Sequence, residues 1–155
     1  MTEPELPRQT PPYLADEAAL EAFIAAWRAG TLPKTAWTHA AHVAVCAYYG
    51  WADVPLDEVF AAMKAGIVAY NEAVGTANTP TSGYHETLTR FWAGTVVAHL
   101  AAVRQPTRLE AVRAAVAAFG EARNLHAAHY SFDVVRDPSA RATWVAPDLV
   151  TNQDN

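Results

Sequence analysis

The stretch NTPTSGYHETLTRFW, residues 78–92, passes from a turn into a helix and carries a His-Glu pair at the join. Its first half holds Asn, Thr, Pro, Ser and Gly, which are the residues that favour turns. Its second half begins an apolar stripe at helical spacing, since Leu88 and Trp92 are four residues apart. The question is whether His85, beside Glu86, only marks the start of a helix or takes part in chemistry.

Turn residues and apolar periodicity divide the rest of the chain in the same way. Asp16 and Thr38 are suitable N-caps, Pro55 suits a first helical turn, and Gly follows several apolar stripes. We expect helices at residues 16–28, 39–49, 55–75, 84–103, 108–119 and 124–135, with a short helical turn at 140–144. Alternating strand patterns are hard to find. The sequence therefore predicts an all-α fold, a single-domain bundle of five or six helices.

Length and composition set the expected domain boundaries. The chain has 155 residues, of which 52% are apolar and 17% charged, so one domain with a substantial core is expected. Four prolines within the first twelve residues disfavour a helix there. We therefore expect a flexible Pro-rich arm at residues 1–14, a helical domain at 15–150 and a polar tail at 151–155.

Charge and cysteine content narrow the partners and the compartment. The net charge is −5 and the 11 Lys and Arg residues are scattered, so we expect no nucleic acid partner. Each apolar run is interrupted before the roughly 18 residues that a membrane helix needs, and the N-terminus does not resemble a signal peptide. The single cysteine, Cys46, rules out an intramolecular disulfide. These features predict a cytoplasmic protein that contacts no membrane; an oligomer stays compatible with the sequence.

Three histidines are candidates for a metal site. His39 and His42 lie three residues apart on a predicted helix, so their rings stand about 60° apart on one face. That face continues through Val43 and Cys46, which form the buried stripe. The predicted helix at 84–103 presents His85 to the core near its first turn. Two helices thus offer three imidazoles to one point, the smallest protein set for an open metal site.

The metal prediction depends on the third histidine, because a lone His-x-x-His pattern on a helix is usually incidental. Three buried imidazoles without an ion would each need satisfied hydrogen bonds. The order also differs from that of zincins, since Glu86 follows His85 directly. We interpret Cys46 and His99 as core residues.

Glu86 and Tyr84 are the candidate catalytic residues. In the structural interpretation, Glu86 is a first-turn acid favoured by the helix dipole, and it pairs with Arg90 at i+4. Successive residues lie about 100° apart around a helix, so Glu86 does not easily bind the same ion as His85. In the functional interpretation, Glu86 orients a ligand or moves a proton, and Tyr84 supplies a hydroxyl beside it.

A second polar cluster comprises His126, His129 and Asp133, with Tyr130 between them. His126 and His129 repeat the spacing of three, and Asp133 follows four residues later. We interpret the cluster as the polar face of the predicted helix at 124–135, since apolar partners there are sparse. The alternative is that this cluster completes the first site.

Three segments of the chain carry a family resemblance that covers most of it from about residue 20 onward. They are a Thr-His-x-x-His segment, a Tyr-His-Glu-Thr-x-Thr segment and a C-terminal Ala-Arg…Trp-Val-x-Pro-Asp-Leu segment. With these the chain resembles an uncharacterised family of small bacterial all-helical proteins. The resemblance implies no activity; it implies that the two histidine segments are shared features and that His126 and His129 are peculiar to this chain. The matching residues are Thr38, His39 and His42; Tyr84, His85, Glu86, Thr87 and Thr89; and Ala140, Arg141, Trp144, Val145, Pro147, Asp148 and Leu149.

We therefore expect a small metal-dependent enzyme in which His39, His42 and His85 hold one divalent transition metal: iron, zinc, copper, nickel or manganese. The ion would activate water, dioxygen or a small organic substrate, and nearby aromatic residues would line an apolar pocket for it. A metal-free enzyme with His85 and Glu86 as acid and base is one alternative. A non-enzymatic module that binds a metal or a ligand is the other.

Overall fold

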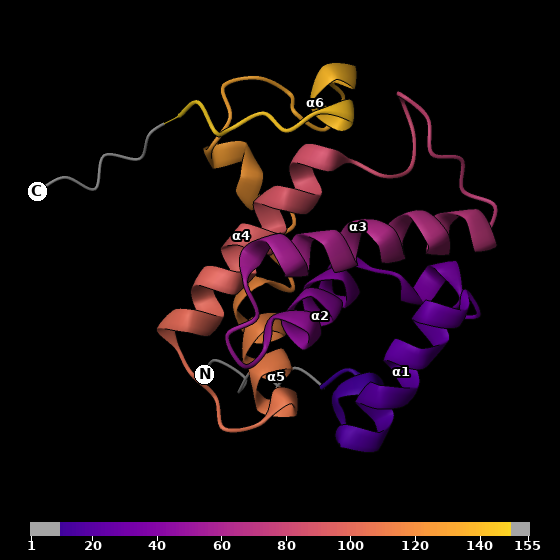
Figure 1. The fold of residues 1–155 in the computed structure, drawn as a ribbon, viewed down its shortest axis with the longest axis vertical. Coiled ribbons are helices and arrows are strands. Elements are labelled where there is room, and N and C mark those ends of the chain that lie inside the picture. The colour runs from indigo at the N-terminus through magenta and orange to yellow at the C-terminus, as the bar shows by residue number, and fades with distance from the viewer. Residues whose placement is uncertain (1–9, 150–155) are drawn as a thin grey trace, which may run out of the picture.

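The computed structural model describes residues 10–149, which form six α-helices and three short 3-10 helices and contain no strand (Figure 1). The all-α fold predicted from the sequence is therefore confirmed. The α-helices are α1 (Glu17–Ala29), α2 (His39–Gly50), α3 (Leu56–Ala73), α4 (Glu86–Ala102), α5 (Arg108–Phe119) and α6 (Pro138–Ala142). The 3-10 helices are η1 (Pro12–Leu14), η2 (Lys34–Ala36) and η3 (Leu125–Ala128).

Side-chain caps begin the helices where the sequence predicted them. The carboxylate of Asp16 accepts a hydrogen bond from the backbone N–H of Ala19 at 2.7 Å, and Thr38 Oγ1 accepts one from Ala41 at 3.2 Å. These bonds satisfy donors that have no partner inside a helix. Helix α3 follows Pro55 directly, and α5 spans residues 108–119 as predicted.

Helix α2 is the centre of the bundle and contacts α3, α4 and α5 (Figure 1). Its residues 43–48 are all buried, as expected for a helix that neighbours surround. Helix α1 contacts α3 and buries Leu20, Phe23, Ile24 and Trp27, and the indole of Trp27 lies over Gly66. A Cβ atom at Gly66 would come within 2.0 Å of that ring, so only glycine permits this approach.

The predicted helix at 124–135 is wrong. Only η3 is helical there, and the chain then turns. Backbone groups of this segment form hydrogen bonds with C-terminal residues instead of with one another. The N–H of Ser131 donates to Asp148 at 2.9 Å, and the carbonyl of His129 accepts from Leu149 at 3.1 Å. The irregular segment packs on Phe91 of α4 through a second apolar cluster, completed by Tyr130, Val134 and Ala140. The short C-terminal helix is α6, slightly earlier than predicted.

The ends of the chain were also part of the sequence prediction. The arm at 1–14 lies mostly outside the described residues, as does the tail at 151–155. Where the arm is described, it is ordered: η1 forms a turn, and Leu14 is buried with its carbonyl accepting from Arg113 at 2.8 Å. Within residues 10–149, no helix has both the length and the apolar character needed to cross a membrane.

Candidate functional site

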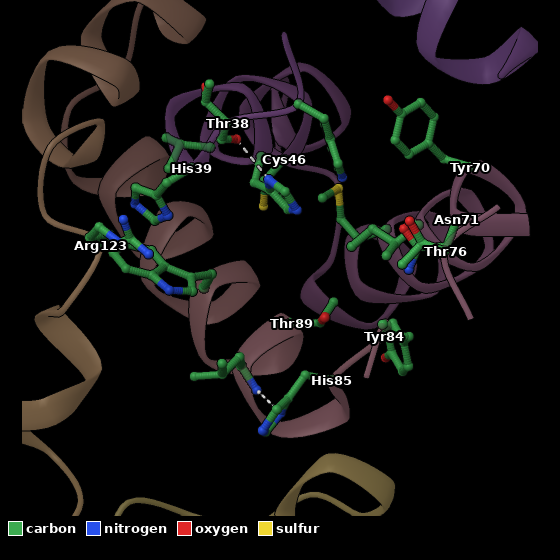
Figure 2. A pocket seen from close by; sticks show the side chains of 18 of the residues that line it. Thr38, His39, Cys46, Tyr70, Asn71, Thr76, Tyr84, His85, Thr89 and Arg123 are labelled. Carbon is green, nitrogen blue, oxygen red and sulfur yellow. Dashed lines mark hydrogen bonds between the residues drawn. The ribbon is translucent and has the colours of Figure 1, made fainter. Parts of the chain in front are cut away.

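A pocket of about 850 Å³ opens between α2, α3 and α4, and residues 123–135 contribute to its wall (Figure 2). Its wall combines a few polar groups with aromatic and apolar side chains, which is the usual composition of a small-molecule site. All three histidines of the predicted metal site line it, and Tyr84 does too. The structure therefore places these side chains around one cavity.

The two histidines of α2 each use one ring nitrogen to bind a backbone carbonyl. His42 donates from Nδ1 to the carbonyl of Thr38 at 2.8 Å, and its ring stacks on Trp37 with 3.8 Å between centroids. His39 donates from Nε2 to the carbonyl of Phe119 at 3.0 Å. Because a carbonyl oxygen only accepts, these contacts fix the proton positions. His42 Nε2 and His39 Nδ1 are left as acceptors when the rings are neutral.

Both of these rings are neutral at pH 7. Burial lowers the pKa of His42 to about 4. Burial also lowers the pKa of His39, and the nearby guanidinium of Arg123 acts in the same direction. Loss of water penalises the charged form of an imidazole. The pocket therefore presents two uncharged hydrogen-bond acceptors on one helix.

His85 has a different role, because both of its ring nitrogens bind the backbone. It is the N-cap of α4: Nδ1 accepts from the N–H of Leu88 at 3.1 Å, and Nε2 donates to the carbonyl of Val134 at 2.8 Å. Burial lowers the pKa of His85, which keeps Nδ1 available as an acceptor. His85 thus begins the helix and also fastens residues 123–135 to it.

The three rings line one pocket without forming a metal-binding group. Figure 2 shows His39 and His85 on separate walls. Within residues 10–149, no set of three or more His, Cys, Asp and Glu side chains is arranged to hold a metal ion. A centre made of His39, His42 and His85 stays a prediction, and it would require His85 to release one of its backbone partners.

The predicted catalytic residues form a hydrogen-bonded pair at the pocket wall. The hydroxyl of Tyr84 donates to Glu86 Oε1 at 2.5 Å, and Lys64 Nζ donates to Glu86 Oε2 at 3.2 Å. Burial raises the pKa of Tyr84, and the hydrogen bond to Glu86 raises it further. The predicted pairing of Glu86 with Arg90 is wrong, since Arg90 reaches Asp57 instead, at 3.6 Å.

The loop before α4 holds Tyr84 in this position. Asn78 Oδ1 accepts from the N–H of Tyr84 and from Asn71 Nδ2, both at 2.9 Å. Gly83 has φ +77°, and a Cβ atom there would lie 2.5 Å from the carbonyl oxygen of Ala77. The turn residues of the loop therefore place the tyrosine in the pocket as well as starting the helix.

Sequence reasoning missed Arg123 as a residue of the pocket wall, and it included His126 only as part of the second polar cluster, with a place in the first site as the alternative. The side chain of Arg123 lies beside His39 (Figure 2). His126 is 8% exposed, and its buried Nδ1 makes no hydrogen bond within the described chain. The rest of the predicted second cluster lies apart: His129 packs on Phe91, and Asp133 pairs with Arg136. No local pattern signals that residues 123–126 fold back onto α2.

No protein-family profile, curated protein or solved structure matches this chain. Its resemblance to an uncharacterised bacterial family therefore stays a prediction.

Proposed function

We propose that the protein binds a small organic molecule in this pocket and catalyses a proton transfer on it. The observation that carries the proposal is the Tyr84–Glu86 pair, because one member lines the pocket and the other stands directly behind it. Tyr84 Oη takes a proton from the bound molecule while its own proton passes to Glu86 Oε1. The reverse movement returns a proton to a second atom of the molecule, so that the side chains end as they began.

This coupled movement suits the electrostatics of the pair. Burial and Glu86 raise the pKa of Tyr84, so a free phenolate is not formed at neutral pH. A hydroxyl that gives and receives a proton in one step avoids that state, and Lys64 holds the carboxylate in place on its far side. His39 and His42, as neutral acceptors, would orient a hydroxyl or N–H group of the bound molecule.

The test uses aromatic carbonyl compounds as probes, with phenylpyruvate and indole-3-pyruvate first. We expect the protein in D₂O to accelerate exchange of the C–H protons next to the ketone, followed by ¹H NMR. Tyr84→Phe and Glu86→Gln should each reduce the rate by about 100-fold, a typical contribution of an acid-base group. Exchange no faster than in buffer, or an unchanged rate in Tyr84→Phe, would overturn the proposal.

The chain offers a matched control for this experiment. Tyr48 donates to Glu21 at 2.8 Å, which is a second Tyr-Glu pair that does not line the pocket. Tyr48→Phe removes the same kind of hydrogen bond and should leave exchange unchanged. A probe that binds without exchange would instead favour a non-enzymatic ligand-binding module.

A metal centre is the second candidate, and one observation favours it. His39 and His42 each donate one ring N–H to a backbone carbonyl, and such contacts commonly orient imidazoles that bind a metal. Iron, zinc, copper, nickel or manganese would then bind these two rings, with His85 as the third ligand after a rearrangement. The test is the metal content of protein purified without a His-tag: one ion per chain, lost in His42→Gln, would support this candidate. We place either activity in the cytoplasm, as the single thiol of Cys46 leads us to expect.

A further inference from the structure

We propose that the molecule bound in this pocket is an aromatic carboxylate, or a similar organic anion, whose charge lies near Arg123 and Lys34. This inference rests on the proposed function only in using the same pocket and probes of similar size. It does not depend on proton transfer.

The charge of the pocket wall points to an anion. Among the described residues that line the pocket, Lys34 and Arg123 are cationic, whereas no Asp or Glu is present, although the whole chain has a net charge of −5. Neither of the two forms an ion pair within residues 10–149. Lys64 and Arg104, by contrast, pair with carboxylates elsewhere. Two cations without protein partners at one cavity attract a negatively charged ligand.

His126 is a further polar residue of the pocket wall. The residue is 8% exposed, and its Nδ1 is covered by protein atoms, so the ring faces the cavity by its other atoms. Burial lowers the pKa of His126, and a backbone contact with Arg123 opposes that shift. The ring lies close enough to His39 and to His85 for a charge on it to lower the pKa of each. Arg123 lines the same wall, and a guanidinium can bind both oxygens of a carboxylate.

The rest of the wall suits an aromatic body. Trp37, Tyr70 and Trp92 line the cavity together with Met63 and Ile67. Aromatic rings contribute by stacked or edge contacts in addition to apolar burial. With a cavity of about 850 Å³ there is room for a one-ring or two-ring acid.

The test compares acids with their uncharged amides. Phenylacetate with phenylacetamide, and indole-3-acetate with indole-3-acetamide, would be titrated into the full chain by calorimetry at pH 7.5 and low salt. We expect each acid to bind at least tenfold more tightly than its amide, and the difference to shrink as salt is added. Arg123→Gln and Lys34→Gln should each reduce the preference severalfold.

The control and the outcomes keep the two proposals separate. Arg104→Gln removes a cation that lies outside this pocket and should preserve the preference. Equal binding of acids and amides would overturn the anion inference and leave the proton-transfer proposal standing. Preference for acids that survives both Arg123→Gln and Lys34→Gln would overturn the placement of the charge. No binding of any acid or amide at millimolar concentration would count against both proposals.

Discussion

Replacing His85 by Ala should destabilise the junction between α4 and the segment at 123–135, whatever ligand or ion is present. Two hydrogen bonds are lost. Loss of an N-cap costs about 1 kcal/mol, and a buried carbonyl left without its donor, here that of Val134, costs about 1–3 kcal/mol. The free energy of unfolding should therefore fall by about 2–4 kcal/mol.

A second substitution separates the two contributions. Asn at position 85 can still cap α4 through its side-chain oxygen, but it is too short to reach Val134. His85→Asn should therefore recover about 1 kcal/mol relative to His85→Ala. The assay is urea unfolding followed by circular dichroism in the presence of a chelator. Hydrogen exchange should show added loss of protection in residues 134–149 in both variants.

Three results would refute this reasoning. His85→Ala could leave stability within about 0.5 kcal/mol of the parent, the range of an ordinary surface substitution. Equal destabilisation by Ala and Asn would show that the capping bond contributes nothing. The third result is that His85→Ala is less stable than the parent only when both are measured with added metal, and equally stable with chelator. That result would identify His85 as a metal ligand instead of a backbone partner.

Two further predictions concern stability. The free energy of unfolding should fall by up to about 3 kcal/mol as pH falls from 6.5 toward 4. The reason is that unfolded His42 takes up a proton near pH 6.5, whereas burial lowers its folded pKa to about 4. Urea unfolding at a series of pH values measures this, and a free energy of unfolding that stays constant down to pH 4.5 would contradict it. Thr87→Val should reduce the free energy of unfolding by about 2–3 kcal/mol. The fully buried hydroxyl donates to the carbonyl of Thr143 and accepts from the N–H of Val145, and both backbone groups would lose their partner. Hydrogen exchange near residue 145 that is no faster than in the parent would contradict this prediction.

Most of the helical framework could be predicted from the sequence because its signals are local. Asp16 and Thr38 cap helices through contacts three residues away, and Pro55 and Gly30 mark ends in the same short range. The helix predicted from residue 124 onward was wrong for the opposite reason. Its helical pattern is overridden by Asp148 and Leu149, which bind its backbone from about twenty residues away, and a local pattern does not contain that contact.

Four of the residues singled out from the sequence, His39, His42, Tyr84 and His85, line one pocket, but their hydrogen-bond partners could not be predicted. The spacing of His39 and His42 predicted that both lie on one buried helix face. The turn residues before Tyr84 predicted the junction between the loop and the next helix. The sequence did not show that His85 would use both ring nitrogens, because Val134 is remote in the chain. For the same reason the pairing of Glu86 with Lys64 replaced the expected pairing with Arg90.

The most direct test of the central claim, that this pocket holds a small organic ligand beside Tyr84, is an NMR titration of the isotope-labelled chain with phenylacetate. Trp37 and Trp92 line the pocket, while Trp51 lines a separate cavity of about 360 Å³ and serves as an internal control. We predict saturable shifts of the Trp37 and Trp92 indole signals and of the Tyr84 ring, with Trp51 unmoved. Shifts that do not saturate, or that are largest at Trp51, would contradict the claim.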